Sequence, residues 1–184
     1  MRKRKINTKK EILKVASDLF SQRGYFGVSM SDIAQDVGVG KSALYYHFES
    51  KEILLKELME TSCKNLRLKL KRSVKSSTTP FDVVFNIVKT LLDYRIIHPE
   101  ISLLTSLSLS SDDREPVVQF IIDLRVELLK LIRDLIGGLD FIRRKGRRSA
   151  HVFSSSILGF VLSPLVTKDT SSKDLSHQLM SFLN

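Results

Sequence analysis

The chain has 184 residues, of which 42% are hydrophobic, enough to bury one core or two small adjoining ones. Its formal net charge of +10 favours a polyanionic partner, nucleic acid first and an anionic membrane surface second. No apolar run is long enough to span a bilayer and no secretory signal is recognisable, so we expect a globular protein that works in the cytoplasm without a membrane partner.

Four consecutive cations, Arg2 to Lys5, precede the first expected helix. Such a basic arm could follow the phosphates of a nucleic acid or enter its minor groove. The alternative is a tail that only improves solubility.

The segment from Gly24 to Phe48 is predicted to form two short helices joined by a glycine turn. Ser29 and Asp32 are spaced as an N-cap and its capping-box partner, ahead of an apolar face that includes Ile33. Gly38 follows as the expected left-handed residue at the end of the first helix. This arrangement is a helix-turn-helix.

The second of these helices is expected to present an unusual outer face. Leu44 and Phe48 lie four residues apart and should point inward, which leaves small and aromatic side chains outside: Ser42, Ala43, Tyr45, Tyr46 and His47. Small side chains let a helix N-terminus approach base edges in a major groove, while tyrosine hydroxyls, His47 and Lys41 can reach phosphates. The alternative is a three-helix bundle in which both tyrosines are half-buried packing residues and His47 is a surface polar residue.

These residues resemble the amino-terminal domain of the tetracycline-repressor (TetR) family. The stretches that carry the resemblance cover about the first third of the chain: Ile12 to Phe20, Gly24-Tyr25, Ser29 to Ala34, Gly38-Val39, Leu44 to Phe48 and Ser50-Lys51-Glu52. The resemblance implies an all-α, homodimeric, ligand-responsive transcriptional regulator, usually a repressor. The family's DNA contacts carry over to these positions: Ser29, Lys41, Ser42, Ala43, Tyr45, Tyr46, His47 and Lys51. Many relatives have Ser-Lys-Gly where this chain has Gly40-Lys41-Ser42.

We expect two domains, a helix-turn-helix DNA-binding domain over 1–50 and a helical effector-binding and dimerisation domain over 51–184. Ser50 should cap a long helix that runs from Lys51 into the low seventies. Further helices are predicted over these ranges: Pro80 to His98, His98 to about Leu109, and Pro116 to Ile136, the last closed by Gly137-Gly138. The stretch from Ser110 to Glu115 is expected to be a connector.

Arg125 is the most conspicuous candidate for ligand binding in the second domain. It falls opposite the polar strip of its helix, and an unpaired guanidinium is costly to bury. Its partner could be a protein carboxylate such as Asp93 or an anionic group on an effector; the alternative is an internal ion pair or an arginine that reaches the surface. Arg95 and His98 are further candidates, although cations also favour a helix C-terminus.

The last two helices, about Ser149 to Leu162 and Ser172 to Leu183, carry apolar faces, and the second shows Leu175, Leu179, Phe182 and Leu183 on one stripe. In proteins that this chain resembles, the final helices pair across a two-fold axis as a four-helix bundle. We therefore predict a homodimer through these helices. The alternative is that the same stripes pack inside one subunit.

Chemistry other than binding has little support. Cys63 is the single cysteine, so no internal disulfide is possible, and a redox role would need a lowered pKa. The four histidines are scattered, and the sequence lacks metal-ligand spacing, a phosphate-binding glycine loop and a nucleophile motif. We expect no enzyme activity, no metal and no cofactor, with an enzyme or carrier that uses a helical cavity as the remaining alternative.

The predicted function is therefore a repressor of a pseudo-palindromic double-stranded operator. A small apolar or amphipathic effector would enter a cavity lined by the helices that begin near Pro80, Glu100 and Pro116, move the helix that begins at Lys51, and lower operator affinity. A helix-turn-helix protein that binds DNA without an effector is the main alternative.

Overall fold

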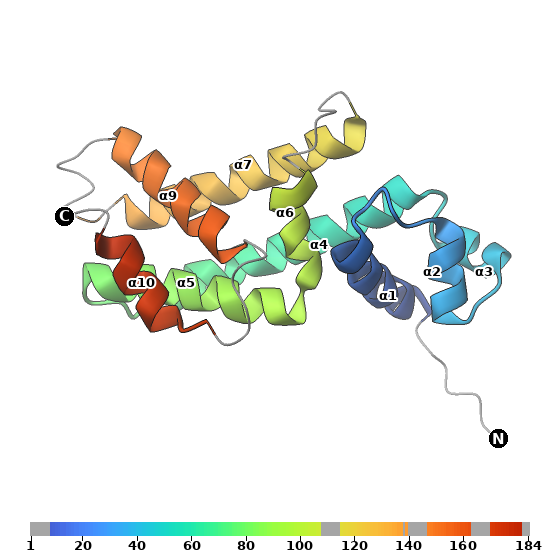
Figure 1. The fold of residues 1–184 in the computed structure, drawn as a ribbon, viewed down its shortest axis with the longest axis horizontal. Helices are drawn as coiled ribbons and strands as arrows, with labels where there is room; N and C mark the ends of the chain where they lie inside the picture. The colour runs from blue at the N-terminus through green and yellow to red at the C-terminus, as the bar shows by residue number, and fades with distance from the viewer. Residues whose placement is uncertain (1–7, 108–114, 138, 140–146, 163–169, 182–184) are drawn as a thin grey trace, which may run out of the picture.

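A computed structural model describes residues 8–107, 115–137, 139, 147–162 and 170–181, and every regular element within these ranges is a helix. A small lobe of three helices lies at one end and a longer helical body at the other (Figure 1). The basic arm, Arg2 to Lys5, lies outside the described residues. The expectation of an all-α fold is confirmed.

The small lobe consists of α1 (Thr8–Arg23), α2 (Met30–Val37) and α3 (Lys41–His47). Each helix contributes fully buried side chains to a common core: Ile12 and Phe20 from α1, Ile33 from α2, and Leu44 from α3, with Phe48 just beyond it. Burial of one such side chain stabilises the fold by about 1.5–3 kcal/mol. This core fixes the orientation of α3.

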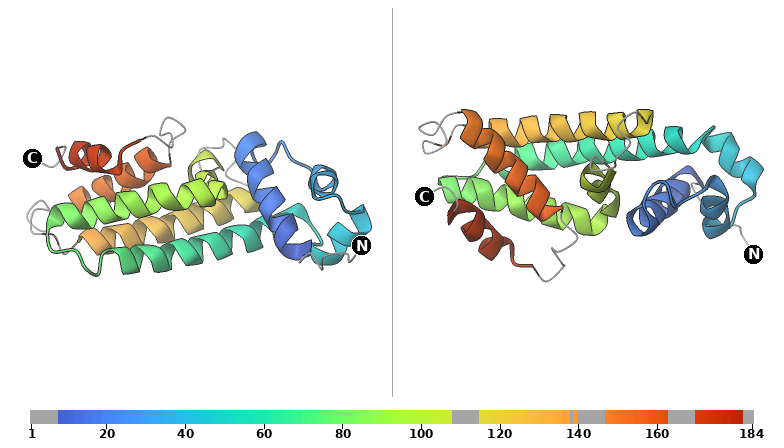
Figure 2. Two further views of the ribbon diagram at one scale, coloured as in Figure 1. Left: turned by 90° about the horizontal axis from the view of Figure 1, so that it is seen from below. Right: turned by 45° about the horizontal axis from the view of Figure 1, so that its top comes forward.

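Helix α4 (Lys51–Ser73) begins beside the small lobe and runs into the body (Figures 1 and 2). As predicted, Ser50 caps it, and its hydroxyl accepts a hydrogen bond from the Ile53 N–H at 3.2 Å. Leu54, Leu58 and Leu66 are buried along its length. One continuous helix therefore belongs to the packing of both parts of the molecule.

The body is built around α4, α5 (Pro80–Ile97) and α7 (Pro116–Ile136), which pack against one another; α9 (Arg147–Val161) lies on α7 and α10 (Ser172–Ser181) on α5 (Figure 2). Thr79 caps α5 in a capping box with Asp82, and Pro80 occupies the first helical position, where its missing N–H costs nothing. Within the described residues, no helix combines the length and the apolar composition that crossing a membrane requires.

The segment after α5 differs from the single helix predicted from His98 to about Leu109. It consists of the short 3-10 helix η1 (Pro99–Ser102) followed by α6 (Leu103–Ser106), and residues 108–114 lie outside the described part. His98 ends α5 in a non-helical conformation, and Pro99 then starts a new, tighter turn. This turn lies against α1, α4 and α5.

The apolar stripe of the last helix is used inside the subunit. Leu175 and Leu179 are 5% and 1% exposed, and α10 packs on α5. The two leucines follow the alternative considered from the sequence and are not available to a second copy. Phe182 and Leu183 lie outside the described residues.

Candidate DNA interface and effector cavity

The start of α2 is fixed by reciprocal hydrogen bonds between Ser29 and Asp32. The Ser29 N–H donates to Asp32 Oδ2 at 2.7 Å, and the Asp32 N–H donates to Ser29 Oγ at 3.2 Å. Hydrogen bonds from Ser29 hold the pKa of Asp32 below its usual value. Ser29 is exposed, but its hydroxyl is already engaged in capping, so the DNA contact predicted for it stays a prediction.

The turn between α2 and α3 depends on a left-handed glycine. Gly38 has φ +76°, and its N–H donates to the Gln35 carbonyl at 3.1 Å. The N–H of Val39 then donates to the Ala34 carbonyl at 3.0 Å, which closes the helix end. A side chain at residue 38 would pay the steric penalty of the left-handed region, even though a Cβ there would meet no neighbouring atom.

Helix α3 presents the side chains that the sequence analysis assigned to its outer face. Leu44 is completely buried, whereas Tyr46 is 86% exposed and Tyr45 is 49% exposed. Lys41, Ser42 and Ala43 are exposed, and His47 is half-buried. The rings of His47 and Tyr46 meet edge to face, with 5.2 Å between their centroids. Tyr46 is therefore not a packing residue. The exposed face carries a cation, small side chains and phenol hydroxyls, and it contains no carboxylate between Lys41 and His47.

Lys51 has a structural role that the sequence analysis missed. Its ammonium donates to the carbonyls of Tyr25 and Val28 at 3.1 and 2.9 Å, and it lies 4.2 Å from the centre of the Tyr25 ring. Desolvation lowers the pKa of Lys51. Because an ammonium has three N–H donors, one remains for the phosphate contact that the resemblance implies. Tyr25 and Lys51 belong to two separate stretches that carry the family resemblance, and only the folded chain brings them together.

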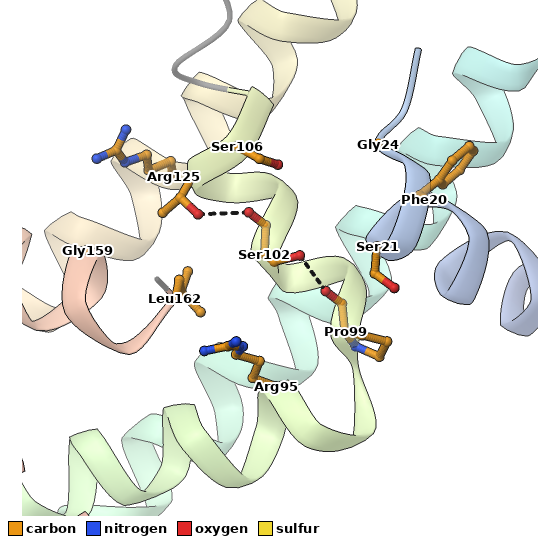
Figure 3. A pocket seen from close by; sticks show the side chains of 11 residues that line it. Phe20, Ser21, Gly24, Arg95, Pro99, Ser102, Ser106, Arg125, Gly159 and Leu162 are labelled. Atoms are coloured by element: carbon orange, nitrogen blue, oxygen red, sulfur yellow. Dashed lines mark hydrogen bonds between the residues drawn. The ribbon is translucent and has the colours of Figure 1, made fainter. Parts of the chain in front are cut away.

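A cavity of about 640 Å³ lies where the small lobe meets the body (Figure 3). The end of α1 contributes Phe20, Ser21 and Gly24 to one side of it. The η1–α6 segment lies in the middle of the view, and the opposite side includes Arg95 and Arg125. A ligand in this cavity would therefore contact the DNA-binding lobe and the regulatory helices together.

Two of the three predicted effector residues line this cavity. Arg95 and Arg125 do so, and Arg95 also donates to the Val161 carbonyl at 2.8 Å. His98 does not line it; its ring stacks on Tyr94 with a centroid distance of 4.2 Å. The effector contact predicted for His98 thus has no geometric support.

Asp93 was considered as the carboxylate partner of Arg125. Its carboxylate instead accepts from Lys89 at 2.6 Å, one turn earlier on the same helix. This pair is exposed and gives at most a small stabilisation.

A buried carboxylate ties the two parts of the molecule together beside the cavity. Glu100 is 1% exposed; Ser17 of α1 donates its hydroxyl to Oε2 and Ser62 of α4 donates to Oε1. His98 Nδ1 lies 3.3 Å from Oε1, and the Tyr94 hydroxyl donates to the Ser62 carbonyl at 2.9 Å. Buried polar groups joined in this way fix the relative position of the elements that carry them. No local pattern in the sequence indicates this cluster, because its serines lie 83 and 38 residues from Glu100.

Cys63 does not have the properties of a redox sensor. It is 4% exposed, and burial raises the pKa of its thiol to about 12, so the reactive thiolate is not formed near neutral pH. Within the described ranges, no three His, Cys, Asp or Glu side chains come together in a group that could hold a metal ion.

The chain is similar in sequence to known bacterial regulatory proteins. The family model for "Bacterial regulatory proteins, tetR family" matches residues 12–58. The HTH-type transcriptional regulator AcrR of Shigella flexneri is 37% identical over 87 residues, which is 47% of this chain and 40% of AcrR. An uncharacterized HTH-type transcriptional regulator in the lacX 3′ region of Lactococcus lactis subsp. lactis is 26% identical over 185 residues, 95% of this chain and 91% of that protein.

Solved structures extend the similarity of fold to nearly the whole chain. A TetR-family transcriptional regulator from Bordetella parapertussis 12822 has a TM-score of 0.77 at 24% identity, with 97% of this chain and 94% of that chain covered. AibR, solved in complex with isovaleryl coenzyme A and operator DNA, has a TM-score of 0.70 at 20% identity, with 96% and 97% covered. At these identities the similarity establishes the fold alone.

Proposed function

Because the chain belongs to the TetR family of bacterial regulatory proteins, we propose that it represses transcription by binding a pseudo-palindromic operator through the outer face of α3. The observation that carries this proposal is the exposure of Tyr46, Tyr45 and Lys41 on a helix whose opposite side, at Leu44, is fully buried. A helix held in this way can enter a major groove without rearrangement of the small lobe.

The outer face divides into two kinds of contact. Ser42 and Ala43 are small and lie near the N-terminal end of α3, so they would approach base edges and influence sequence preference. Lys41, Tyr46 and His47 would hold phosphates and fix the position of the helix along the groove. These phosphate contacts would make the affinity for DNA fall as the salt concentration rises, because each contact releases bound counterions.

We propose that two copies act together, since a two-fold operator requires two recognition helices about 34–36 Å apart. The dimer would form through the outward side of α9, with α10 alongside. Val152 on α9 supports this choice, because it is 63% exposed while Ile157 and Leu158 of the same helix are buried. Val152→Glu should weaken self-association in analytical ultracentrifugation, and an unchanged dimer would place the interface elsewhere.

An effector in the cavity would lower operator affinity, because the cavity is bounded both by the end of α1 and by the regulatory helices. A coupling free energy of about 1–3 kcal/mol is enough to change affinity roughly 5- to 150-fold. Glu100 offers a route for this coupling. It neighbours the cavity residue Pro99 and accepts hydrogen bonds from Ser17 in the DNA-binding lobe and Ser62 in α4, so a shift of η1 would change the position of α1 relative to α4. AibR supports the presence of a ligand site in this fold, since its structure contains isovaleryl coenzyme A together with operator DNA.

The main alternative is a DNA-binding protein that responds to no effector. This alternative predicts that the affinity of the protein for its operator is the same in the presence of every compound tested. An enzyme is a weaker alternative, because the known relatives are transcriptional regulators. The cavity is lined by arginines, hydroxyls and apolar groups, without an adjacent acid and base among the described lining residues.

DNA binding can be tested with the duplex from immediately upstream of the chain's own coding region. Wild-type protein should shift this duplex at lower concentration than a scrambled duplex of equal length. Tyr46→Ala should weaken the shift about tenfold or more, whereas Val126→Ala, which truncates an exposed residue of α7 outside the small lobe, should leave it unchanged. Equal affinity for both duplexes and for all three proteins would reject the proposed function.

A further inference from the structure

We propose that the effector is an amphipathic organic anion, whose carboxylate or phosphate group lies on the side of the cavity lined by Arg95 and Arg125 while its apolar part extends toward the end of α1. This inference rests on the proposed function, because it specifies the chemical class of the effector. It also predicts the orientation of the ligand within the cavity.

The charge distribution around the cavity supports an anion. Arg95 from α5 and Arg125 from α7 bring two guanidinium groups to its lining, and none of the described lining residues is a carboxylate. Desolvation lowers the pKa of Arg95, which indicates that water solvates this charge poorly. An oxyanion would be attracted to both cations and can accept two parallel hydrogen bonds from one guanidinium.

Three hydroxyl groups that line the cavity already donate hydrogen bonds to backbone carbonyls. Ser21 donates to the Asp18 carbonyl at 2.9 Å, Ser102 donates to the Pro99 carbonyl at 2.8 Å, and Thr105 donates to the Ser102 carbonyl at 2.8 Å. Their protons are therefore engaged with the backbone, and the oxygens that remain are acceptors. Among the described lining residues the two guanidinium groups are the cationic donors, so they are the groups that would receive an anion.

The positions of these groups set the orientation of the ligand. Arg95 and Arg125 lie on the same side of the view as Gly159 and Leu162, whereas Phe20, Ser21 and Gly24 lie across the η1–α6 segment from them (Figure 3). With its anionic group at the arginines, the ligand would place its apolar end beside the end of α1 in the DNA-binding lobe. Pro99, which is half-buried, supplies apolar surface along the way.

Gly159 provides an independent way to block the cavity. It lines the cavity from α9, and a Cβ built on it would meet no atom within 4 Å. A larger side chain at this position would therefore extend into open space and reduce the volume available to a ligand. The replacement also removes a glycine from a helix, which favours folding.

The test is calorimetric titration of the full chain with straight-chain carboxylates from hexanoate to decanoate. The matched probes are the primary alcohol, the methyl ester and the alkyl phosphate of the same chain length. The carboxylate or the phosphate should bind at least tenfold more tightly than the alcohol and the ester. A tighter carboxylate identifies a free acid, and a tighter phosphate identifies a phosphorylated compound; either result supports the shared oxyanion chemistry.

Variants locate the bound anion. Arg125→Gln and Arg95→Gln should each weaken anion binding at least tenfold and leave the alcohol unaffected, and Gly159→Leu should block both ligands. Lys130→Gln removes an exposed cation of α7 that does not line the cavity, so it should change nothing. The inference is overturned if no anion binds, if alcohol and anion bind equally, or if the double arginine variant retains the wild-type affinity.

Operator affinity measured in parallel separates this inference from the proposed function. Operator binding without any binding of anions would overturn the ligand class and leave the DNA-binding function intact. Arginine-dependent anion binding that does not change operator affinity would support the ligand class and reject the proposed effector response.

Discussion

Asp32 in the small lobe and Glu100 at the junction both lie near the start of a helical turn, but they are held in opposite ways. The hydrogen bonds of Asp32 are exposed, and their partner, Ser29, lies three residues away. Glu100 is buried, and its hydroxyl partners, Ser17 and Ser62, are 83 and 38 residues away. The small lobe is thus specified by local hydrogen bonds, whereas the junction depends on contacts that exist only after the two parts of the chain have come together.

The largest expected effect is on the junction. Glu100→Ala would leave the Ser17 and Ser62 hydroxyls without their acceptor in the interior and would create a void. We expect a loss of about 3 kcal/mol in the free energy of unfolding. Urea denaturation followed by circular dichroism measures this loss.

Glu100→Gln is the matched control for that variant. Its amide retains an acceptor for one hydroxyl and can donate to the oxygen of the other, so it should lose only about 1 kcal/mol. Equal stability of wild type, Glu100→Ala and Glu100→Gln would show that the carboxylate does not hold the two parts together.

The next effect concerns the contact between the small lobe and α4. Lys51→Met keeps the aliphatic stem of Lys51 but removes its hydrogen bonds to the Tyr25 and Val28 carbonyls, so it should cost about 2 kcal/mol. Lys14→Met, at an exposed site on α1, should cost less than about 0.5 kcal/mol.

The same variant tests the DNA contact predicted for Lys51. If its third N–H binds a phosphate, Lys51→Met should reduce the slope of log affinity against log salt concentration by about 1. An unchanged slope would limit Lys51 to its structural role.

A smaller effect is expected at the turn before α3. Gly38→Ala places a Cβ on a residue with φ +76° and should destabilise the chain by about 1 kcal/mol. Gly40→Ala is the control, because residue 40 has φ −69° and open space around its Cβ position. Thermal unfolding compares the two. An equal loss in both variants would contradict the role assigned to the left-handed turn.

The smallest effect depends on pH. Hydrogen bonds from Ser29 lower the pKa of Asp32 below its ordinary value of 3.8. The Ser29–Asp32 hydrogen bonds therefore contribute their full stabilisation at pH values above the ordinary pKa of Asp32. This stabilisation is lost as the pH falls through the lowered pKa of the folded protein. Ser29→Ala should cost about 1 kcal/mol at pH 7, and its stability should fall less steeply than that of wild type below the ordinary pKa. Parallel curves for the two proteins would contradict this assignment.

The same contrast explains which features could be predicted from the sequence. The caps at Ser29, Ser50 and Gly38 follow from side chains and backbone groups a few residues apart, and the buried side of α3 follows from the spacing of Leu44 and Phe48. These local rules fix the small lobe and most helix boundaries.

Long-range contacts account for what was missed. Nothing near Glu100 in the sequence indicates that serines from α1 and α4 will meet its carboxylate. Likewise, the spacing of apolar residues in α10 places Leu175 on an apolar stripe. It does not indicate whether α5 of the same subunit or a second copy of the chain covers that stripe. Arg125 was recognised as unusual from its helix face, whereas its placement opposite α1 across a cavity required the folded chain.

The central claim, that the outer face of α3 lies against DNA, can be tested directly by cross-linking. Cys63 is buried with a raised pKa, so a cysteine introduced at an exposed serine should be the reactive thiol. Ser42→Cys on α3 and Ser181→Cys at the end of α10 both provide such a site. With operator DNA that carries a thiol-reactive group in the major groove, we predict efficient cross-linking of Ser42→Cys and none of Ser181→Cys. Equal cross-linking at the two positions, or none at residue 42 under conditions in which the complex forms, would contradict the account.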